Sequence, residues 1–271
     1  MLYVCGTPIG NLNDITPRLI ETLNLVDLII CEDTRHSIKL LNHLNISKKL
    51  ISYHQHNEFK KVDYIIDLLK NGNKIALLSD AGMPVISDPG AILVKKVIEN
   101  NIPIVPISGP SAFILALIAS GFDIEPFIFY GFIDRDKQKK DNFFKDIKEQ
   151  NKAIVIYESP FKLIKTLKEV LEKIDDIEVC IARELTKRFE EFWRGKISDA
   201  ITYFSEKEIK GEFCIVFQPY QKKEEITQNT IELFAKSLLL QGLHKKEAGK
   251  IMAEKYNIKS SDAYKILLDL S

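Results

Sequence analysis

The stretch Lys74–Gly90, KIALLSDAGMPVISDPG, places an apolar run directly before two polar turns. The run Ile75–Leu78 has the length and composition of a buried β-strand. Ser-Asp-x-Gly begins at Ser79 and again at Ser87, eight residues later. Strands that end in such loops often bring their backbone close to a ligand, although each copy alone could be an ordinary β-turn. The pair predicts a ligand-binding loop, provided that the rest of the chain agrees.

The same pattern of strand and loop recurs through the first half of the chain. Apolar runs at 2–5, 27–31, 50–53, 75–78 and 102–107 alternate with helix-like segments at 16–26, 34–46, 59–70, 91–99 and 112–119. This alternation predicts a parallel sheet covered on both faces, with ligands at the carboxyl ends of its strands. We therefore expect one sheet edge to gather the loops GTPIGN (6–11), EDTR (32–35), SDAGMP (79–84) and SGPSA (108–112).

The second half is also α/β, and its strand spacing suits a mixed sheet. Strands are predicted at 127–132, 153–157, 179–182 and 213–218, with helices at 137–149, 161–172 and 197–204. SGFDIEP (120–126) links the halves, and a polar linker at 218–227 leads to three helices, the last capped by Ser260 or Ser261. The predicted domains are an N-terminal α/β domain (1–119), a second α/β domain (120–220) and a small C-terminal helical domain (228–271).

Composition narrows the function classes only slightly. Lys+Arg and Asp+Glu both number 38, so the chain lacks the strong basic charge typical of nucleic-acid binders. A neutral chain could still bind a nucleic acid through a local basic patch. With no long apolar run and no signal-peptide pattern, we expect neither a membrane segment nor secretion. Four scattered cysteines without Cys-x-x-Cys indicate reduced thiols in a cytoplasmic protein. His54 and His56 lack further ligands, so no metal is expected.

The glycine-rich loops match neither Gly-x-Gly-x-x-Gly nor the Walker loop, so they indicate neither NAD nor nucleoside-triphosphate binding. YESP (157–160) and ARELTKRFEEFWRG (182–195) follow strands of the second half. Glu158, Arg183 and Glu184 are thus candidates to reach a neighbouring cleft, or members of surface ion pairs. No nucleophile elbow supports Ser-His-Asp catalysis.

Taken with LYVCGTPIGNL, SYHQHNE and KGEF, these motifs resemble the tetrapyrrole-methylase-like S-adenosylmethionine transferases over nearly the first 220 residues, in the expected order. Within that family they are most similar to the branch that methylates the ribose 2′ oxygen of a cytidine in small-subunit (16S) ribosomal RNA. The resemblance implies a homodimer with two α/β domains and the cofactor in the cleft between them. The helical tail also looks like the C-terminal extension of that branch.

The resemblance also implies which residues hold the cofactor, S-adenosyl-L-methionine. They are Pro8, Ile9, Asp80, Met83, Ser87, Ser111, Ala112, Tyr157, Ala182 and Glu212. Where the family usually carries Gly-Asp-Pro, this chain reads Ser79-Asp80-Ala81, so the backbone contact there can differ in detail. Asp88-Pro89-Gly90 is expected instead to cap and open the following helix.

A sulfonium methyl group is a strong electrophile, so such an enzyme mainly has to align the ribose hydroxyl with it. A ribose hydroxyl is a poor nucleophile, so a base or an electrostatic partner would help. The candidates at the predicted edge are Asp33, Arg35, Glu158 and Glu184, and Arg35 could instead bind an RNA phosphate.

Two other functions stay open on the residues alone. One is a methyltransferase for a small tetrapyrrole or corrin precursor, and the other is a non-catalytic module that binds RNA or the ribosomal particle. Lysines of the helical tail could bind RNA or simply form a solvated face.

Overall fold

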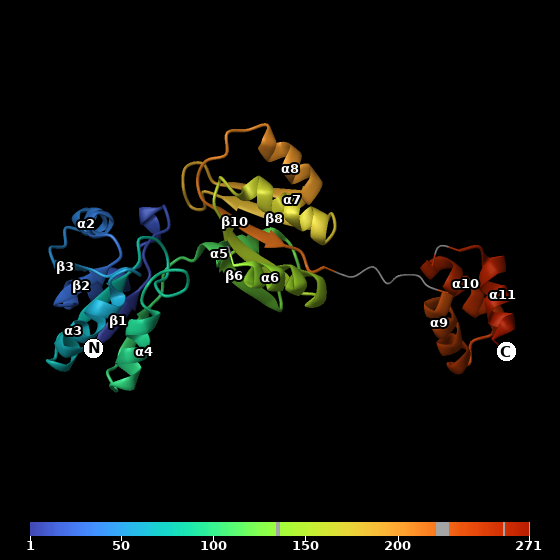
Figure 1. Ribbon diagram of the computed structural model, residues 1–271, viewed down its shortest axis with the longest axis horizontal. Helices are drawn as coiled ribbons and strands as arrows, with labels where there is room; N and C mark the ends of the chain where they lie inside the picture. Colours follow the sequence, from blue (N-terminus) through green and yellow to red (C-terminus); the bar gives the residue numbers. More distant parts are fainter. Residues whose placement is uncertain (134–135, 221–227, 257, 271) are drawn as a thin grey trace. The chain divides into compact units, whose positions relative to one another are not determined.

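A computed structural model describes residues 1–133, 136–220, 228–256 and 258–270 of the chain (Figure 1). The chain divides into two compact units, Met1–Tyr220 and Gln221–Ser271. The larger unit carries two five-stranded sheets, and the smaller one is helical. The predicted fold class is confirmed. Residues 221–227, most of the predicted linker, lie outside the described residues.

The first sheet is parallel throughout, with the strand order β3-β2-β4-β1-β5. Successive strand residues face opposite sides of the sheet, and helices cover both sides, which explains the continuous apolar runs. Val4 packs with α3 and α4 on one face, and its neighbour Tyr3 packs with α1 and α2 on the other. The elements are β1 (Leu2–Cys5), α1 (Pro17–Leu25), β2 (Leu28–Cys31), α2 (Thr34–His43), β3 (Lys49–Ser52), α3 (Glu58–Lys70), β4 (Ile75–Leu78), α4 (Ala91–Glu99) and β5 (Ile104–Ile107).

The second sheet is mixed, with the order β6-β7-β10-β8-β9. β6 and β7 are parallel, while β10 runs antiparallel to both β7 and β8, and β9 antiparallel to β8. Its elements are β6 (Phe127–Phe132), α6 (Lys137–Glu149), β7 (Ala153–Glu158), α7 (Leu163–Lys173), β8 (Glu178–Arg183), β9 (Glu191–Lys196), α8 (Ile197–Ser205) and β10 (Phe213–Phe217).

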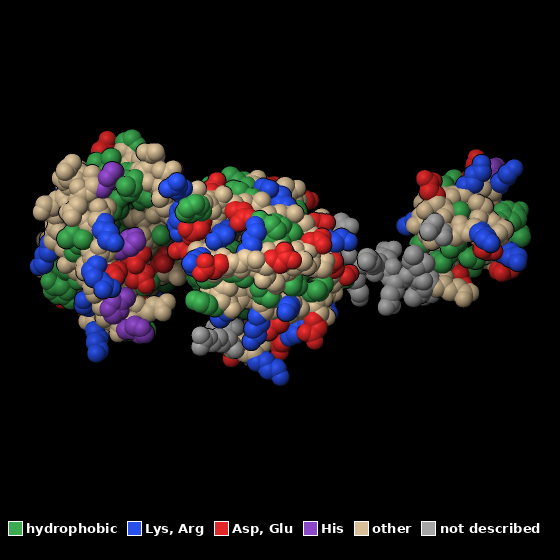
Figure 2. Space-filling view, turned by 90° about the horizontal axis from the view of Figure 1, so that it is seen from above, with side chains coloured by type: hydrophobic (Ala, Val, Ile, Leu, Met, Phe, Trp, Pro, Cys, Tyr) green, Lys and Arg blue, Asp and Glu red, His purple; other side chains and the backbone are tan. Residues whose placement is uncertain are grey.

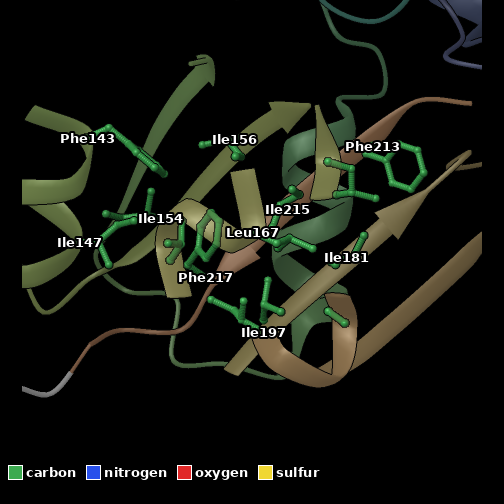
Figure 3. Close-up of a cluster of buried hydrophobic side chains, with 14 of the residues drawn as sticks. Phe143, Ile147, Ile154, Ile156, Leu167, Ile181, Ile197, Phe213, Ile215 and Phe217 are labelled. Atoms are coloured by element: carbon green, nitrogen blue, oxygen red, sulfur yellow. The ribbon is translucent and has the colours of Figure 1, made fainter. Parts of the chain in front are cut away.

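The main core of this sheet lies under α6, α7 and α8. Figure 3 shows how Phe143 and Leu167 from the helices meet Ile154, Ile215 and Phe217 from the strands. Each of these side chains is almost fully buried. Burial of one such side chain contributes about 1.5–3 kcal/mol, so this layer holds the second half of the unit together.

The opposite face of the second sheet is covered by α5 (Ala112–Ser120), which follows the last strand of the first sheet. Ile9, from the loop after β1, packs in the same apolar cluster. The loop at 108–111 therefore passes from the edge of the first sheet to a helix of the second. The boundary between residues 119 and 120 stays a prediction.

Local signals predicted some helix starts correctly and others incorrectly. The Thr16 side chain accepts a hydrogen bond from the amide of Leu19, and Pro17 begins α1, as predicted. The expected cap by Ser260 or Ser261 is wrong: Lys259 holds the N-cap position of α11, and Ser260 is already helical. Within the predicted cap Asp88-Pro89-Gly90, the N-cap of α4 is Gly90, and no side chain makes a cap hydrogen bond.

The C-terminal unit is a small bundle of α9 (Gln228–Leu240), α10 (Lys245–Tyr256) and α11 (Ser260–Asp269). Its own apolar cluster includes Ala235, Met252 and Leu267, all fully buried. The three helices thus have a core that is separate from those of the sheets. Within the described residues, no helix is both long and apolar enough to span a bilayer.

Candidate active site

The predicted loops start from one row of the first sheet. In the strand register, Cys5 at the end of β1 lies beside Leu78 of β4 and Ile107 of β5, and Leu78 lies beside Cys31 of β2. The four loops that follow these strands therefore leave the same edge, as the sequence predicted. This edge is where parallel sheets bind ligands.

The loops after β1 and β4 are joined to each other. The Thr7 amide donates to the Gly82 carbonyl at 2.9 Å, and the Gly82 amide donates to the Thr7 carbonyl at 3.1 Å. The Thr7 hydroxyl also donates to the carbonyl of Ser79 at 3.2 Å. Gly82 has a φ of +80°, which a side chain would oppose. The two loops consequently form one wall.

The loop after β5 packs backbone to backbone against the loop after β1. A Cβ atom on Gly109 would lie 2.7 Å from the backbone of Gly6, and one on Gly6 would lie 2.5 Å from the sulfur of Met83. Only glycine allows this approach, because real Cβ atoms do not come so close to other heavy atoms. Three strand-end loops are thereby fixed together.

A cavity of about 330 Å³ opens beside this wall and reaches the strand ends of the second sheet. Its volume is within the range of small-molecule sites. Eight of the ten predicted cofactor residues line it: Ile9, Met83, Ser87, Ser111, Ala112, Tyr157, Ala182 and Glu212. Pro8 and Asp80 instead line a neighbouring cavity of about 150 Å³, together with His36 and Lys39. The predicted cofactor residues therefore form part of the lining of each of two cavities.

Tyr157 and Ser111 form a polar pair in the wall of the main cavity. Burial raises the pKa of Tyr157 to about 12, and the Ser111 side chain interacts with its hydroxyl. The phenol therefore remains protonated near neutral pH and is available as a hydrogen-bond donor. Ser111 is the N-cap residue of α5, but its side chain makes no cap hydrogen bond, so its hydroxyl serves the cavity side.

Acidic side chains concentrate at this edge of the first sheet. Figure 2 shows Asp and Glu side chains gathered on the N-terminal part of the larger unit, with His side chains beside them. Asp88 lines the main cavity, and burial together with the charges of Glu32 and Asp80 raises its pKa to about 6. Burial and the charge of Asp80 also raise the pKa of Glu32. Asp88 thus titrates close to neutrality.

Glu158 is the one of the four predicted catalytic residues that lines the main cavity. Its side chain is 5% exposed. One carboxylate oxygen accepts from the amide of Ser159 at 2.8 Å, and the other accepts from the hydroxyl of Thr166 at 2.6 Å. These donors fix the orientation of the carboxylate. Such an anchored group is suited to positioning a ligand by a hydrogen bond or by its charge.

Glu184 is a described residue that does not line the cavity. It supports residues that do. Its carboxylate accepts from the amide of Glu212 at 2.9 Å and from the ammonium of Lys187 at 3.0 Å. Partial burial works against ionisation, but these hydrogen bonds outweigh it and lower the pKa of the Glu184 carboxyl. The group therefore holds the 211–212 turn that lines the cavity.

Asp33 and Arg35 also lie outside the lining, in the part of the chain that the structure describes. Asp33 caps α2 through the amide of Arg35 and forms an ion pair with its guanidinium at 2.7 Å. Hydrogen bonds from Arg35 lower the pKa of Asp33 to about 2. The Arg35 side chain is 89% exposed. This position is compatible with an external contact and places neither group at the cavity.

Several residues that line the main cavity are not among the site residues predicted from the sequence. Asp88 was interpreted as a helix cap, although it belongs to the second Ser-Asp-x-Gly copy. Phe132 is the last residue of β6, and its place at a strand end was a usable signal. Leu185 and Phe213 lie within the motifs ARELTK and KGEF. Their role as a wall depends on tertiary packing alone.

Residues 1–201 match the protein family described as Tetrapyrrole (Corrin/Porphyrin) Methylases. The chain belongs to this family. It is 40% identical to "Ribosomal RNA small subunit methyltransferase I" of Synechocystis sp. over all of this chain and 98% of that protein. Proteins of the same name from Thermotoga maritima and Bacillus subtilis are 48% and 41% identical, covering 79% and 97% of this chain and 96% and 92% of their own lengths.

Solved structures show the same fold at low sequence identity. The cobalt precorrin-4 methyltransferase CbiF covers 80% of this chain and 94% of its own, with a TM-score of 0.60 and 18% identity. Diphthine synthase covers 80% of this chain and 89% of its own, with a TM-score of 0.61 and 10% identity. At these identities the likeness concerns the fold alone.

The chain is therefore a methyltransferase, and its methyl donor is S-adenosylmethionine. The main cavity fits this donor. Where the structure describes it, the lining includes the carboxyl groups of Asp88, Glu158 and Glu212 and contains no Lys or Arg. Such a lining suits a ligand that carries positive sulfonium and ammonium groups and no phosphate. Among the described residues, no group of three or more His, Cys, Asp or Glu side chains could hold a metal ion.

Proposed function

We propose that this chain methylates small-subunit ribosomal RNA, and that the methyl group goes to the ribose 2′ oxygen of a cytidine in 16S RNA. The observation that carries the proposal is the similarity along the whole chain to relatives named ribosomal RNA small subunit methyltransferase I. The match includes the C-terminal helical unit, since it covers all of this chain and 98% of the Synechocystis protein.

The eight predicted cofactor residues that line the main cavity are proposed to hold S-adenosylmethionine. S-adenosylmethionine, when bound, supplies an electrophilic methyl group. The joined loops of Thr7 and Gly82 offer a fixed backbone wall, and the small side chains of Ala112 and Ala182 leave room for a flat ring. Tyr157 can donate a hydrogen bond from its protonated hydroxyl. Pro8 and Asp80 act from the adjoining cavity by supporting the same loops.

Asp88 is our candidate for the group that receives the ribose hydroxyl proton. A general base works best when its pKa lies near the working pH, and the Asp88 carboxyl, with a pKa of about 6, meets that condition. Glu158, held by Thr166 and Ser159, is proposed to orient the ligand rather than exchange a proton. Glu184 supports the cavity, and Asp33 holds Arg35 toward solvent, where the guanidinium contacts RNA.

Two broader expectations complete the proposal. We expect the enzyme to work as a homodimer and in the cytoplasm, where its small-subunit RNA substrate is found. Size-exclusion chromatography with light scattering measures the first, and cell fractionation measures the second.

The function is tested by mapping modified nucleotides of ribosomal RNA by mass spectrometry in cells with and without the protein. Loss of one ribose-methylated cytidine from small-subunit RNA, restored by the wild-type gene, is the expected result. An unchanged modification map would contradict the proposal. Purified enzyme with labelled S-adenosylmethionine should label small-subunit RNA or particles, whereas selective labelling of a tetrapyrrole precursor would indicate a small-molecule enzyme instead.

A further inference from the structure

Phe132 stands at the rim of the main cavity and is largely open to solvent. It is the last residue of β6, it lines the cavity, and 62% of it is exposed. A single exposed apolar residue needs no explanation on a soluble protein. A large aromatic ring kept exposed beside the site of the reaction is different, because it offers a flat apolar face to whatever approaches the methyl donor.

The ring is held in place by other aromatic side chains. Phe113 stacks on Phe129 at 4.2 Å between ring centroids, and Phe129 meets Tyr157 edge-on at 5.1 Å. Tyr157 in turn lies 5.6 Å from Phe132. A continuous aromatic row thus runs from α5 to the cavity rim. Because Tyr157 supports Phe132 from the protein side, the exposed part of the ring is preorganised for a partner.

Further apolar side chains line the same opening. Ile86 lines the cavity from the loop after β4 and is 45% exposed. Pro160 lines it beyond β7. Exposed apolar residues that gather at one opening indicate a binding surface rather than chance.

The charges of the cavity decide which part of an RNA this surface suits. The described lining holds the carboxyl groups of Asp88, Glu158 and Glu212 and lacks Lys and Arg, so it disfavours a phosphate. A nucleobase is flat and uncharged, and sequence-specific RNA recognition commonly places unstacked bases on aromatic side chains. The base of an unpaired nucleotide is free to stack on such a ring while its ribose is presented to the methyl donor.

We propose that Phe132 is the stacking platform for a nucleobase of the RNA substrate, held at the rim so that its ribose faces the methyl donor. This inference rests on the proposed function. It assigns to Phe132 substrate positioning rather than a part in the chemical step.

The test compares Phe132→Leu and Phe132→Tyr in the full-length enzyme, with Phe59→Leu as the matched control. Phe59 lies on α3, is 74% exposed and is not among the residues that line the cavity. For Phe132→Leu we expect kcat/KM with small-subunit RNA to fall about tenfold to a hundredfold, mainly through KM, because stacking on an aromatic ring is lost. Phe132→Tyr keeps the ring and should stay within about threefold of wild type, as should Phe59→Leu.

Calorimetry of S-adenosylmethionine binding separates substrate stacking from a cofactor contact. Affinity for S-adenosylmethionine should be the same in wild type and Phe132→Leu, and thermal unfolding should coincide. Loss of S-adenosylmethionine affinity that accounts for the whole loss of activity would overturn the inference, and so would an unchanged kcat/KM in Phe132→Leu. A wild-type enzyme that transfers no methyl group to small-subunit RNA would instead refute the proposed function, and this inference with it.

Discussion

The carboxylate of Asp88 should destabilise the folded chain at neutral pH, so that wild type is less stable there than the Asp88→Asn variant. Its pKa rises from an ordinary value of 3.8 to about 6, because burial and the charges of Glu32 and Asp80 oppose ionisation. Each pKa unit corresponds to 1.36 kcal/mol, so a difference of about two units gives roughly 3 kcal/mol. Asp88→Asn removes this charge while keeping the shape of the side chain.

The pH dependence has a definite sign. A carboxyl whose pKa is raised by folding binds its proton more tightly in the folded state, so stability falls as the pH rises from about 4 to about 6. The full destabilisation persists above pH 6, where the group is ionised in both states. We therefore expect the free energy of unfolding of Asp88→Asn to be about 3 kcal/mol higher than that of wild type at pH 8, and only about 1 kcal/mol higher at pH 4.5.

Thermal unfolding by calorimetry at these two pH values measures the difference. For a unit of about this size, 1 kcal/mol corresponds to about 2–4 °C, so the Tm of Asp88→Asn should rise by roughly 6–12 °C at pH 8. Asp63→Asn, a change at an exposed position of α3, is the control and should move the Tm by less than about 2 °C. An equal gain at both pH values, or no gain at pH 8, would show that the Asp88 carboxylate is not destabilised by its surroundings. The stabilised variant should also transfer methyl groups more slowly, as expected when a strained charge serves the reaction.

Three further changes test the site. Gly109→Ala places a Cβ atom 2.7 Å from the backbone of Gly6, and we expect a loss of about 1–3 kcal/mol in thermal unfolding together with weaker S-adenosylmethionine binding; an unchanged Tm would contradict this packing. Thr166→Val removes a hydroxyl that donates to the buried carboxylate of Glu158 at 2.6 Å, and it should lower the free energy of unfolding in urea by about 1–3 kcal/mol. Thr166→Ser keeps the hydroxyl and should lose much less, so equal losses in both variants would argue against the hydrogen bond. Lys39→Ala removes a cation from the smaller cavity, and the slope of log K for RNA binding against log salt concentration should become smaller by about 1, while the affinity for S-adenosylmethionine stays the same. An unchanged slope would mean that Lys39 contacts no phosphate.

The first sheet could be predicted almost completely because both of its faces are buried. Ile75–Leu78 and Ala91–Glu99 have the predicted bounds, since an apolar strand and an amphipathic helix each carry a clear period. The mixed nature of the second sheet was also predicted. β9 (Glu191–Lys196) was missed because it is an edge strand with charged ends and only two adjacent aromatic residues. Edge strands face solvent on one side, so they lack the apolar run that reveals a central strand.

The site was predictable where a residue sits on a strand-end loop, and unpredictable where a distant residue sets its environment. Ser111 and Tyr157 come from recognisable motifs, and both line the cavity. Asp88 looked like a helix cap because local turn chemistry says nothing about Glu32, which arrives from the loop after β2, or about Asp80, which lies eight residues earlier in the same loop. The same reason explains Glu184: a charged residue after a strand looks catalytic until its hydrogen-bond partners in the 211–212 turn are known.

The rate at which S-adenosylmethionine binds depends on how the strand-end loops are held. Gly6 lies close against Gly109, and the backbones of Thr7 and Gly82 are paired by two hydrogen bonds. Loops joined in this way cannot open independently, so the wall on the side of the first sheet exists before any ligand arrives. Binding then requires little ordering of the chain, and the entropy lost on association is mostly that of the ligand itself. We expect association of S-adenosylmethionine to follow a single exponential in stopped-flow traces, with a rate that rises in proportion to its concentration and no slow step that limits turnover.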